Sequence, residues 1–188
     1  FDRAGFWGVQ VSVDLADGAH TGTAAFSVLA SPQVPAPGDK AIPSENDVVG
    51  SGAPAAAIDS RAGVNGAVPD PELHSTTIKA ALQQGKPLLL AFSTPVFCIS
   101  KFCGPVTDMV ADLQKIYGNR VTFIHVEVWR DYNKQQLNQA AIDWLLRNND
   151  MREPWVFLVG ADGTILRRWD NVATRGEVEP ALQQLFGP

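Results

Sequence analysis

The sequence predicts an α/β fold in which helices flank a mixed central β-sheet, preceded by a β-rich hairpin and a proline- and glycine-rich linker. Three observations predict this organisation. Residues 6–15 alternate between apolar and polar side chains, as a half-buried strand does. Residues 31–71 hold seven of the 13 prolines and five of the 16 glycines. From residue 72 onward, helical and strand patterns follow one another. We therefore expect three parts, at 1–30, 31–71 and 72–188.

The N-terminal part is expected to form two strands. In the first strand apolar side chains occupy every second position, at Trp7, Val9, Val11, Val13 and Leu15. Asp17-Gly18 marks a turn, and residues 23–29 follow as the second strand. Two strands cannot stably bury a face by themselves. We interpret residues 1–30 as the remnant of an N-terminal β-rich module.

Residues 31–71 are expected to form a linker or an irregular wrap around the next domain. Their apolar residues are mostly alanine and valine and recur with no period. Proline and glycine punctuate the segment throughout. Its length favours a domain boundary near its end.

Residues 72–188 are expected to form helices and strands in the order α-β-α-β-α-β-β-α. Apolar side chains at helical spacing predict helices over 72–84, 106–117 and 134–148, and a capping box of Thr174 and Glu177 begins the last helix. The continuous apolar run 87–93 predicts a strand buried on both faces. Further strands are predicted at 121–128, 155–159 and 165–169. This order implies a mixed, mostly parallel sheet with helices on both faces.

Composition and charge argue against several classes of function. Hydrophobic residues make up 45% of the chain and charged residues 19%, which fits a globular protein with a substantial core. The net charge of −5 and the lack of a dense Lys/Arg block argue against a nucleic-acid partner. The sequence contains no run of about 18 apolar residues, which is the length that a membrane-spanning helix needs. Because residue 1 is Phe, we expect a missing N-terminal segment that could anchor the protein.

The candidate site centres on the only two cysteines, Cys98 and Cys103. They lie between the predicted strand 87–93 and the helix that follows. Five helical residues advance about 7.5 Å along the axis, more than the roughly 4.4–6.8 Å between Cα atoms that a disulfide tolerates. If the pair closes, residues 98–102 must therefore form a loop, with the helix beginning near Gly104 and Pro105 in its first turn.

Three features make residues 72–186 resemble the thioredoxin-like superfamily. They are the element order, the apolar strand Leu88 to Phe92 that leads into Ser-Thr-Pro-Val-Phe-Cys98, and the sequence Arg152-Glu153-Pro154-Trp155 before a strand. The phrase Cys-Ile-Ser-Lys-Phe-Cys-Gly-Pro is similar to a bacterial, extracytoplasmic branch of thioredoxin-like or redoxin proteins. The resemblance implies a thioredoxin fold for 72–188. The family usually has Cys-x-x-Cys, whereas this chain has Cys-x-x-x-x-Cys.

The resemblance also implies roles for individual residues. It makes Pro154 a cis-proline facing the cysteines, with Glu153 beside it to pair with an extended substrate. Either Cys98 attacks with its partner displaced, or Cys103 aligns with the first family cysteine and Val106 replaces the second. A helix N-terminus favours Cys103 as the thiolate, whereas exposure and the family alignment favour Cys98, which we prefer. Lys101 is a candidate for electrostatic support.

Other polar residues give weaker hypotheses. His125 and Glu127 share one face of a strand, where they could act as a general base but more commonly would be hydrogen-bonded core residues. A copper site like that of copper-handling relatives would need a histidine after Pro154, and none occurs there; His20 and His74 lie elsewhere. We therefore assign no metal and no cofactor. Pro95 stands where the peroxiredoxin pattern has threonine, which argues against a peroxidase.

The favoured hypothesis is a thiol–disulfide oxidoreductase that acts through Cys98 and Cys103 on protein or small-molecule thiols and disulfides. The alternative is a non-catalytic thioredoxin-like binding domain with a structural disulfide. The resemblance implies a location outside the cytoplasm, either secreted or membrane-anchored. The sequence leaves open the physiological partner, the direction of electron flow and the oligomeric state.

Overall fold

The computed structural model describes residues 2–63 and 65–185, and it divides the chain into two compact units, Phe1–Gln33 and Val34–Pro188. The first unit is an antiparallel hairpin of β1 (Gly5–Leu15) and β2 (Gly18–Val28). The two-residue turn is Ala16-Asp17, and Gly18 already belongs to β2 with a φ of 130°. The second strand therefore begins five residues before the predicted start at residue 23.

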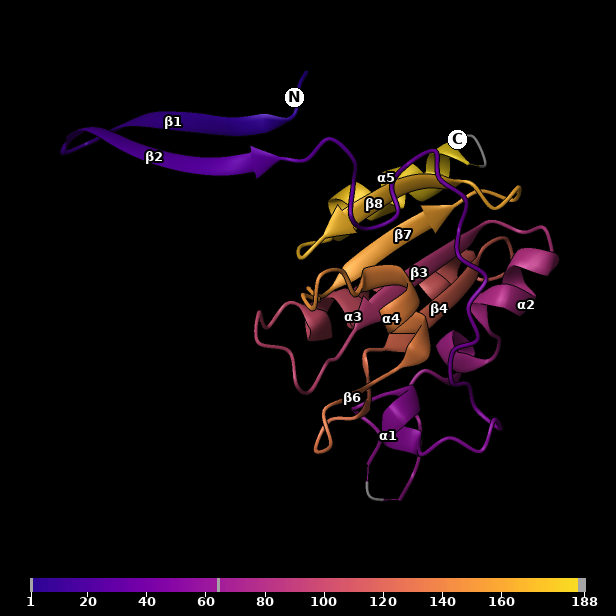
Figure 1. The fold of residues 1–188 in the computed structure, drawn as a ribbon. Coiled ribbons are helices and arrows are strands. Elements are labelled where there is room, and N and C mark those ends of the chain that lie inside the picture. The colour runs from indigo at the N-terminus through magenta and orange to yellow at the C-terminus, as the bar shows by residue number, and fades with distance from the viewer. Residues whose placement is uncertain (1, 64, 186–188) are drawn as a thin grey trace. The chain divides into compact units, whose positions relative to one another are not determined.

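The second unit contains a four-stranded sheet, a small two-stranded ribbon, and helices (Figure 1). Its elements are α1 (Ala55–Ile58), η1 (Pro71–His74), α2 (Ile78–Gln83), β3 (Leu88–Ser93), α3 (Cys103–Tyr117), β4 (Thr122–Glu127), β5 (Trp129–Asp131), β6 (Gln136–Leu137), α4 (Gln139–Leu145), β7 (Trp155–Val159), β8 (Ile165–Asp170) and α5 (Arg175–Gln184).

The main sheet has the strand order β4-β3-β7-β8. Strands β3 and β4 are parallel, whereas β3–β7 and β7–β8 are antiparallel. The sheet is mixed, as predicted, but the expectation of a mostly parallel sheet is wrong. Buried strands such as β3 and β7 are apolar on both faces whether they run parallel or antiparallel to their neighbours. Their residue pattern therefore does not predict the strand direction.

Helices cover both faces of this sheet, which confirms the predicted flanked arrangement (Figure 1). One core lies between the sheet and helices α2 and α4, and its largest side chain, Trp144, packs against Phe92 and Phe157. The other core lies between the opposite face and helices α3 and α5. Successive residues of β3 alternate between the two cores, so this strand is buried throughout.

Residues 34–71, expected as a linker, belong to the second unit in the structure. Their backbone pairs with the start of β8, where Gly38 N–H donates to the Ile165 carbonyl at 2.9 Å and Ile165 N–H donates to Asp39 at 2.9 Å. Farther along, Ala57 and Ile58 of α1 are buried, and α1 and η1 lie against β4. Alanine and valine here fill the edges of the core, which explains why the segment shows no helical or strand period.

Two predicted helices are interrupted. The region 72–84 forms the 3-10 turn η1 and then α2, whose N-cap Thr77 accepts a hydrogen bond from Ala80 N–H at 3.1 Å. The region 134–148 begins with the turn and the second strand of the β5–β6 ribbon. In that turn Asp131 accepts hydrogen bonds from Lys134. Asn138 then caps α4. The predicted capping box of Thr174 and Glu177 at α5 is confirmed.

None of the described helices combines the length and the apolar character needed to cross a lipid bilayer.

Deleting residues 1–33 is expected to change the free energy of unfolding of the second unit by less than about 1 kcal/mol, because the buried side chains of both cores come from beyond residue 33. Urea unfolding of the chain with and without this segment, followed by tryptophan fluorescence, measures the difference. A loss of several kcal/mol would show that the second unit depends on the hairpin for its stability.

Candidate functional site

The cysteines form a Cys98–Cys103 disulfide with their Cα atoms 6.0 Å apart. Residues 98–102 form a turn, and α3 begins at Cys103, one residue before the predicted start. Cys98 is half-buried, whereas Cys103 is fully buried. Cys98 thus lies in the loop and is the more exposed of the two, and Cys103 lies at the helix end, as expected; the complete burial of Cys103 was not expected.

The N-terminus of α3 offers partially positive backbone groups to the buried sulfur. The first hydrogen bond of the helix runs from Val106 N–H to the Phe102 carbonyl at 2.9 Å, and no side chain caps the helix. The N–H groups of Cys103 and Gly104 therefore have no partner within the helix. A thiolate at this end would be stabilised by these groups and by the helix dipole.

Ser100 is a polar neighbour of the accessible sulfur that the sequence reasoning did not single out. Its hydroxyl lies 3.2 Å from Cys98 Sγ. A hydroxyl can donate a hydrogen bond to a thiolate, which would stabilise the charged form of Cys98 when the disulfide opens. The sequence feature that could have identified Ser100 is its position two residues after a cysteine in a predicted loop.

Lys101 is exposed with a φ of 64°, and none of the ion pairs among the described residues involves it.

The Glu153–Pro154 peptide bond is cis, as the resemblance implied. Pro154 is buried and precedes β7, while Glu153 is half-buried. No described residue hydrogen-bonds the buried Oε2 atom of Glu153. Burial, together with the negative charge of Glu127, raises the pKa of Glu153 to about 8. Glu153 is therefore mostly protonated at neutral pH, instead of carrying the charge that its position before the proline suggested.

Glu127 is the second buried carboxyl of this region. It ends β4, and one of its oxygens accepts a hydrogen bond from Ser60 N–H at 2.8 Å while the other accepts one from Trp129 N–H at 3.2 Å. Burial raises its pKa. The nearby Arg130 forms an ion pair with Asp47 at 2.9 Å.

The segment 94–102 between β3 and α3 is called the cysteine loop. An open cleft of about 580 Å³ lies beside it. Its wall includes residues from that loop, from the β5–β6 ribbon, from the segment before β7 and from the end of β8, which are Phe97, Ile99, Ser100, Trp129, Tyr132, Gln135, Met151, Arg152, Glu153, Asp170 and Asn171. Of the predicted site residues Glu153 lines the cleft, whereas Cys98 and Cys103 are represented by their loop neighbours Ile99 and Ser100.

Aromatic packing holds the ribbon against the cysteine loop. The rings of Phe97 and Tyr132 are stacked, with centroids 3.9 Å apart, and Trp129 packs edge-on against Tyr132 at 5.4 Å. The ribbon thus forms one side of the cleft, and one of its cleft residues, Gln135, lies in the region 134–148 that was predicted as a helix. Ile99, by contrast, is 97% exposed at the cleft edge, where an apolar partner could contact it.

The predicted linker also reaches the site. Ser60 follows α1, and its hydroxyl accepts a hydrogen bond from Val96 N–H in the cysteine loop at 3.2 Å. The backbone N–H of Ser60 donates a hydrogen bond to Glu127. Sequence reasoning missed Ser60 because no local pattern connects it with residues that lie 36 and 67 positions further along the chain.

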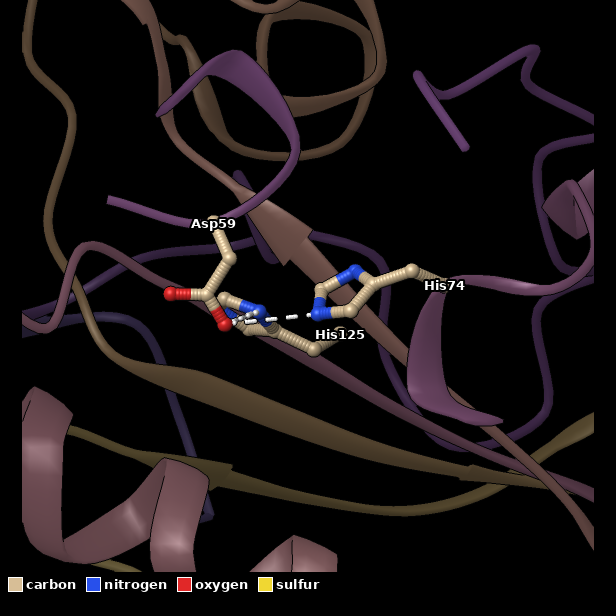
Figure 2. A group of neighbouring side chains, drawn as sticks. All are labelled: Asp59, His74 and His125. Atoms are coloured by element: carbon tan, nitrogen blue, oxygen red, sulfur yellow. Dashed lines mark hydrogen bonds and ion pairs between the residues drawn. The ribbon is translucent and has the colours of Figure 1, made fainter. Parts of the chain in front are cut away.

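The histidines fall into two places. His20 lies in the hairpin, 2.9 Å from Asp17 and exposed. His74 and His125 are fully buried and meet at Asp59 (Figure 2). Among the described residues, Asp59, His74 and His125 are the one group with ligand atoms close enough together for a metal ion, and neither cysteine belongs to it.

Comparisons with known proteins found similarity in structure but not in sequence. No family model and no curated protein matches the sequence. A thio-disulfide isomerase of known structure from Thermus thermophilus matches with a TM-score of 0.33 and 14% identity, over 55% of this chain and 81% of that one.

Proposed function

We propose that this protein is a thiol–disulfide oxidoreductase with a thioredoxin-like domain, in which Cys98 exchanges with the partner and Cys103 is the internal partner sulfur. The observation that carries the proposal is the pairing of a half-buried Cys98 in a loop with a fully buried Cys103 at the start of α3, beside an open cleft. An inert disulfide needs neither an accessible sulfur nor an adjoining cleft.

The exchange proceeds in two balanced steps. A substrate thiolate attacks Cys98 Sγ, a substrate–Cys98 disulfide forms, the Cys98–Cys103 bond breaks, and Cys103 leaves as a thiolate at the helix N-terminus. A second substrate thiolate then attacks the substrate sulfur of the mixed disulfide, and Cys98 leaves as a thiolate beside the Ser100 hydroxyl. The substrate dithiol is oxidised to a disulfide, and the cysteine pair is reduced. The reverse sequence reduces a substrate disulfide.

The cleft gives the proposed substrate class. Glu153 and the aromatic side chains Trp129 and Tyr132 offer an extended peptide a mixed polar and apolar surface, beside the cis bond to the buried Pro154. Because Glu153 is protonated at neutral pH, it can donate a hydrogen bond to a peptide carbonyl and presents no charge that would select basic partners. Protein or small-molecule thiols and disulfides are the proposed partners, and an oxidising compartment outside the cytoplasm is the proposed location.

The test is redox equilibration of the purified protein against a dithiol buffer, together with reduction of a fluorescent peptide disulfide. We expect a reduction potential well above about −300 mV and measurable exchange at micromolar protein. A potential below that value and no exchange would instead support the binding domain with a structural disulfide.

A further inference from the structure

Three buried side chains from distant parts of the chain meet at one point (Figure 2). Asp59 directly follows α1, His74 ends η1, and His125 lies within β4. All three have 0% exposure. The proposed thiol chemistry uses none of them, so their convergence in the interior requires its own explanation.

The distances suit a small divalent ion. Asp59 Oδ2 lies 3.3 Å from His74 Nε2 and 3.6 Å from His125 Nδ1, and the three atoms all lie within 4.8 Å of one another. A tetrahedral zinc ion with bonds of about 2.0–2.1 Å holds neighbouring ligand atoms about 3.3 Å apart. The two separations that involve Asp59 Oδ2 therefore differ from this spacing by at most a few tenths of an ångström.

The hydrogen bonding of His125 shows which ring nitrogen is free. Nε2 lies 3.1 Å from the Ser93 carbonyl, which can only accept, so Nε2 carries the hydrogen. In the neutral ring Nδ1 then carries a lone pair and can only accept a hydrogen bond. It faces a carboxylate oxygen of Asp59, which is also an acceptor (Figure 2). No described residue hydrogen-bonds this buried Nδ1. Two acceptors that face each other away from water call for a cation between them.

A proton on Nδ1 would be the smallest such cation, but the distance disfavours it. A charge-assisted N–H···O bond is typically about 2.7–2.9 Å long, whereas this separation is 3.6 Å.

The surroundings of two of the three residues match those of metal ligands. The Ser93 carbonyl orients His125 through the nitrogen that is not needed for the ion. Arg61 orients Asp59, with its Nε 3.1 Å from Oδ1 and a terminal nitrogen 2.7 Å from Oδ2. The Arg61 guanidinium also contacts Asp70 at 3.0 Å and Asp108 at 3.2 Å, so one cation faces three carboxylates and the group as a whole is anionic. A divalent cation would complement that charge.

We propose that Asp59 Oδ2, His74 Nε2 and His125 Nδ1 form a binding site for a divalent transition metal, with Zn²⁺ as the best match to two imidazoles and one carboxylate. The ion joins α1 and η1 to β4. Because Ser60 next to Asp59 contacts both Glu127 and the cysteine loop, the ion also fixes one wall of the candidate redox site.

The test is titration of the oxidised full-length protein with Co²⁺, followed by displacement with Zn²⁺. Because both cysteines are joined in the disulfide, no thiol can bind the metal, and the result is independent of the proposed exchange activity. We expect one Co²⁺ per chain, with the strong visible d–d absorption of tetrahedral Co²⁺ and without thiolate charge-transfer bands. A weak octahedral spectrum, or no saturable binding, would overturn the proposal.

The chain offers a matched control because it contains only three histidines. His74→Gln and His125→Gln are each expected to weaken metal binding at least about 100-fold, since each removes a direct ligand. His20→Gln is expected to leave the affinity unchanged, because His20 lies in the hairpin with Asp17. Equal affinities in all three variants would contradict the assignment.

Either buried-histidine variant could fail to fold, and a measurement on the unmodified protein then decides. Two-dimensional NMR of the histidine ring nitrogens is expected to show Zn²⁺ shifting the signals of two histidines, one through Nδ1 and one through Nε2, while the third stays unchanged. A shift confined to the exposed histidine, or no shift at saturating Zn²⁺, would refute the site.

Discussion

Cys103→Ser is expected to trap a partner in a stable mixed disulfide, whereas Cys98→Ser is expected to lose exchange by more than about 100-fold without trapping anything. In the first variant the accessible Cys98 remains and can attack, but no internal thiol releases the partner. In the second variant the remaining thiol is Cys103, which is fully buried at the start of α3. Both variants should lose turnover, and only the trapping distinguishes their roles.

Mass spectrometry after incubation with a peptide disulfide, together with iodoacetamide alkylation rates, measures this difference. Cys98 in Cys103→Ser should react at least about tenfold faster than Cys103 in Cys98→Ser, because access limits the reaction of a buried thiol. Ser100→Ala is the matched variant within the loop, and it should slow Cys98 only several-fold by removing a hydroxyl 3.2 Å from the sulfur. Trapping by Cys98→Ser in place of Cys103→Ser would reverse the assigned roles.

Glu153→Gln is expected to flatten the pH dependence of stability between about pH 4.5 and 8. The pKa of Glu153 is raised to about 8 in the folded protein from 4.5, so the folded state holds its proton more tightly than the unfolded state does. The stabilising contribution of the protonated form is complete below pH 4.5 and is lost as pH rises through 8. We expect the loss to be on the order of 2 kcal/mol, after allowance for solvent screening.

Urea unfolding at pH 5, 7 and 9 with the disulfide intact measures this slope for each variant. Glu153→Gln should be more stable than the unmodified protein at pH 9 and similar to it at pH 5. Glu72→Gln, at an exposed glutamate on η1, is the control and should leave the slope unchanged. Glu127 is coupled to Glu153 through its charge, so the slope that Glu153→Gln removes belongs to this pair of carboxyls. Parallel curves for Glu153→Gln and the unmodified protein would rule out a raised pKa at this residue.

The cysteine loop could be predicted from the sequence because its geometry follows from local rules. Helical rise over five residues exceeds the reach of a disulfide, so closure requires a loop before α3. The buried strand β3 and the capping box of α5 follow in the same way from short patterns. Each of these features depends on residues within about one or two turns of chain.

The cleft and the buried cluster required the tertiary structure. The predicted helix begins at residue 134, whereas residues 134–137 belong to the turn and second strand of the ribbon, where Asp131 accepts hydrogen bonds from Lys134 and Tyr132 stacks on Phe97. Asp59 lies in a segment with no periodic pattern, so the sequence offered no reason to place it beside His74 and His125. Only the packing of α1 and η1 against β4 joins the three.

By itself the sequence determined the alternation of helices and strands, and the placement of Cys98 in a loop and of Cys103 at the start of the next helix, because these depend on local backbone geometry and hydrophobic periodicity. The tertiary structure alone decided the direction of β7, the inclusion of residues 34–71 in the second unit, and the proton on Glu153. Strand pairing, burial and the charge of Glu127 set these properties, and all three arise from contacts between residues far apart in the chain.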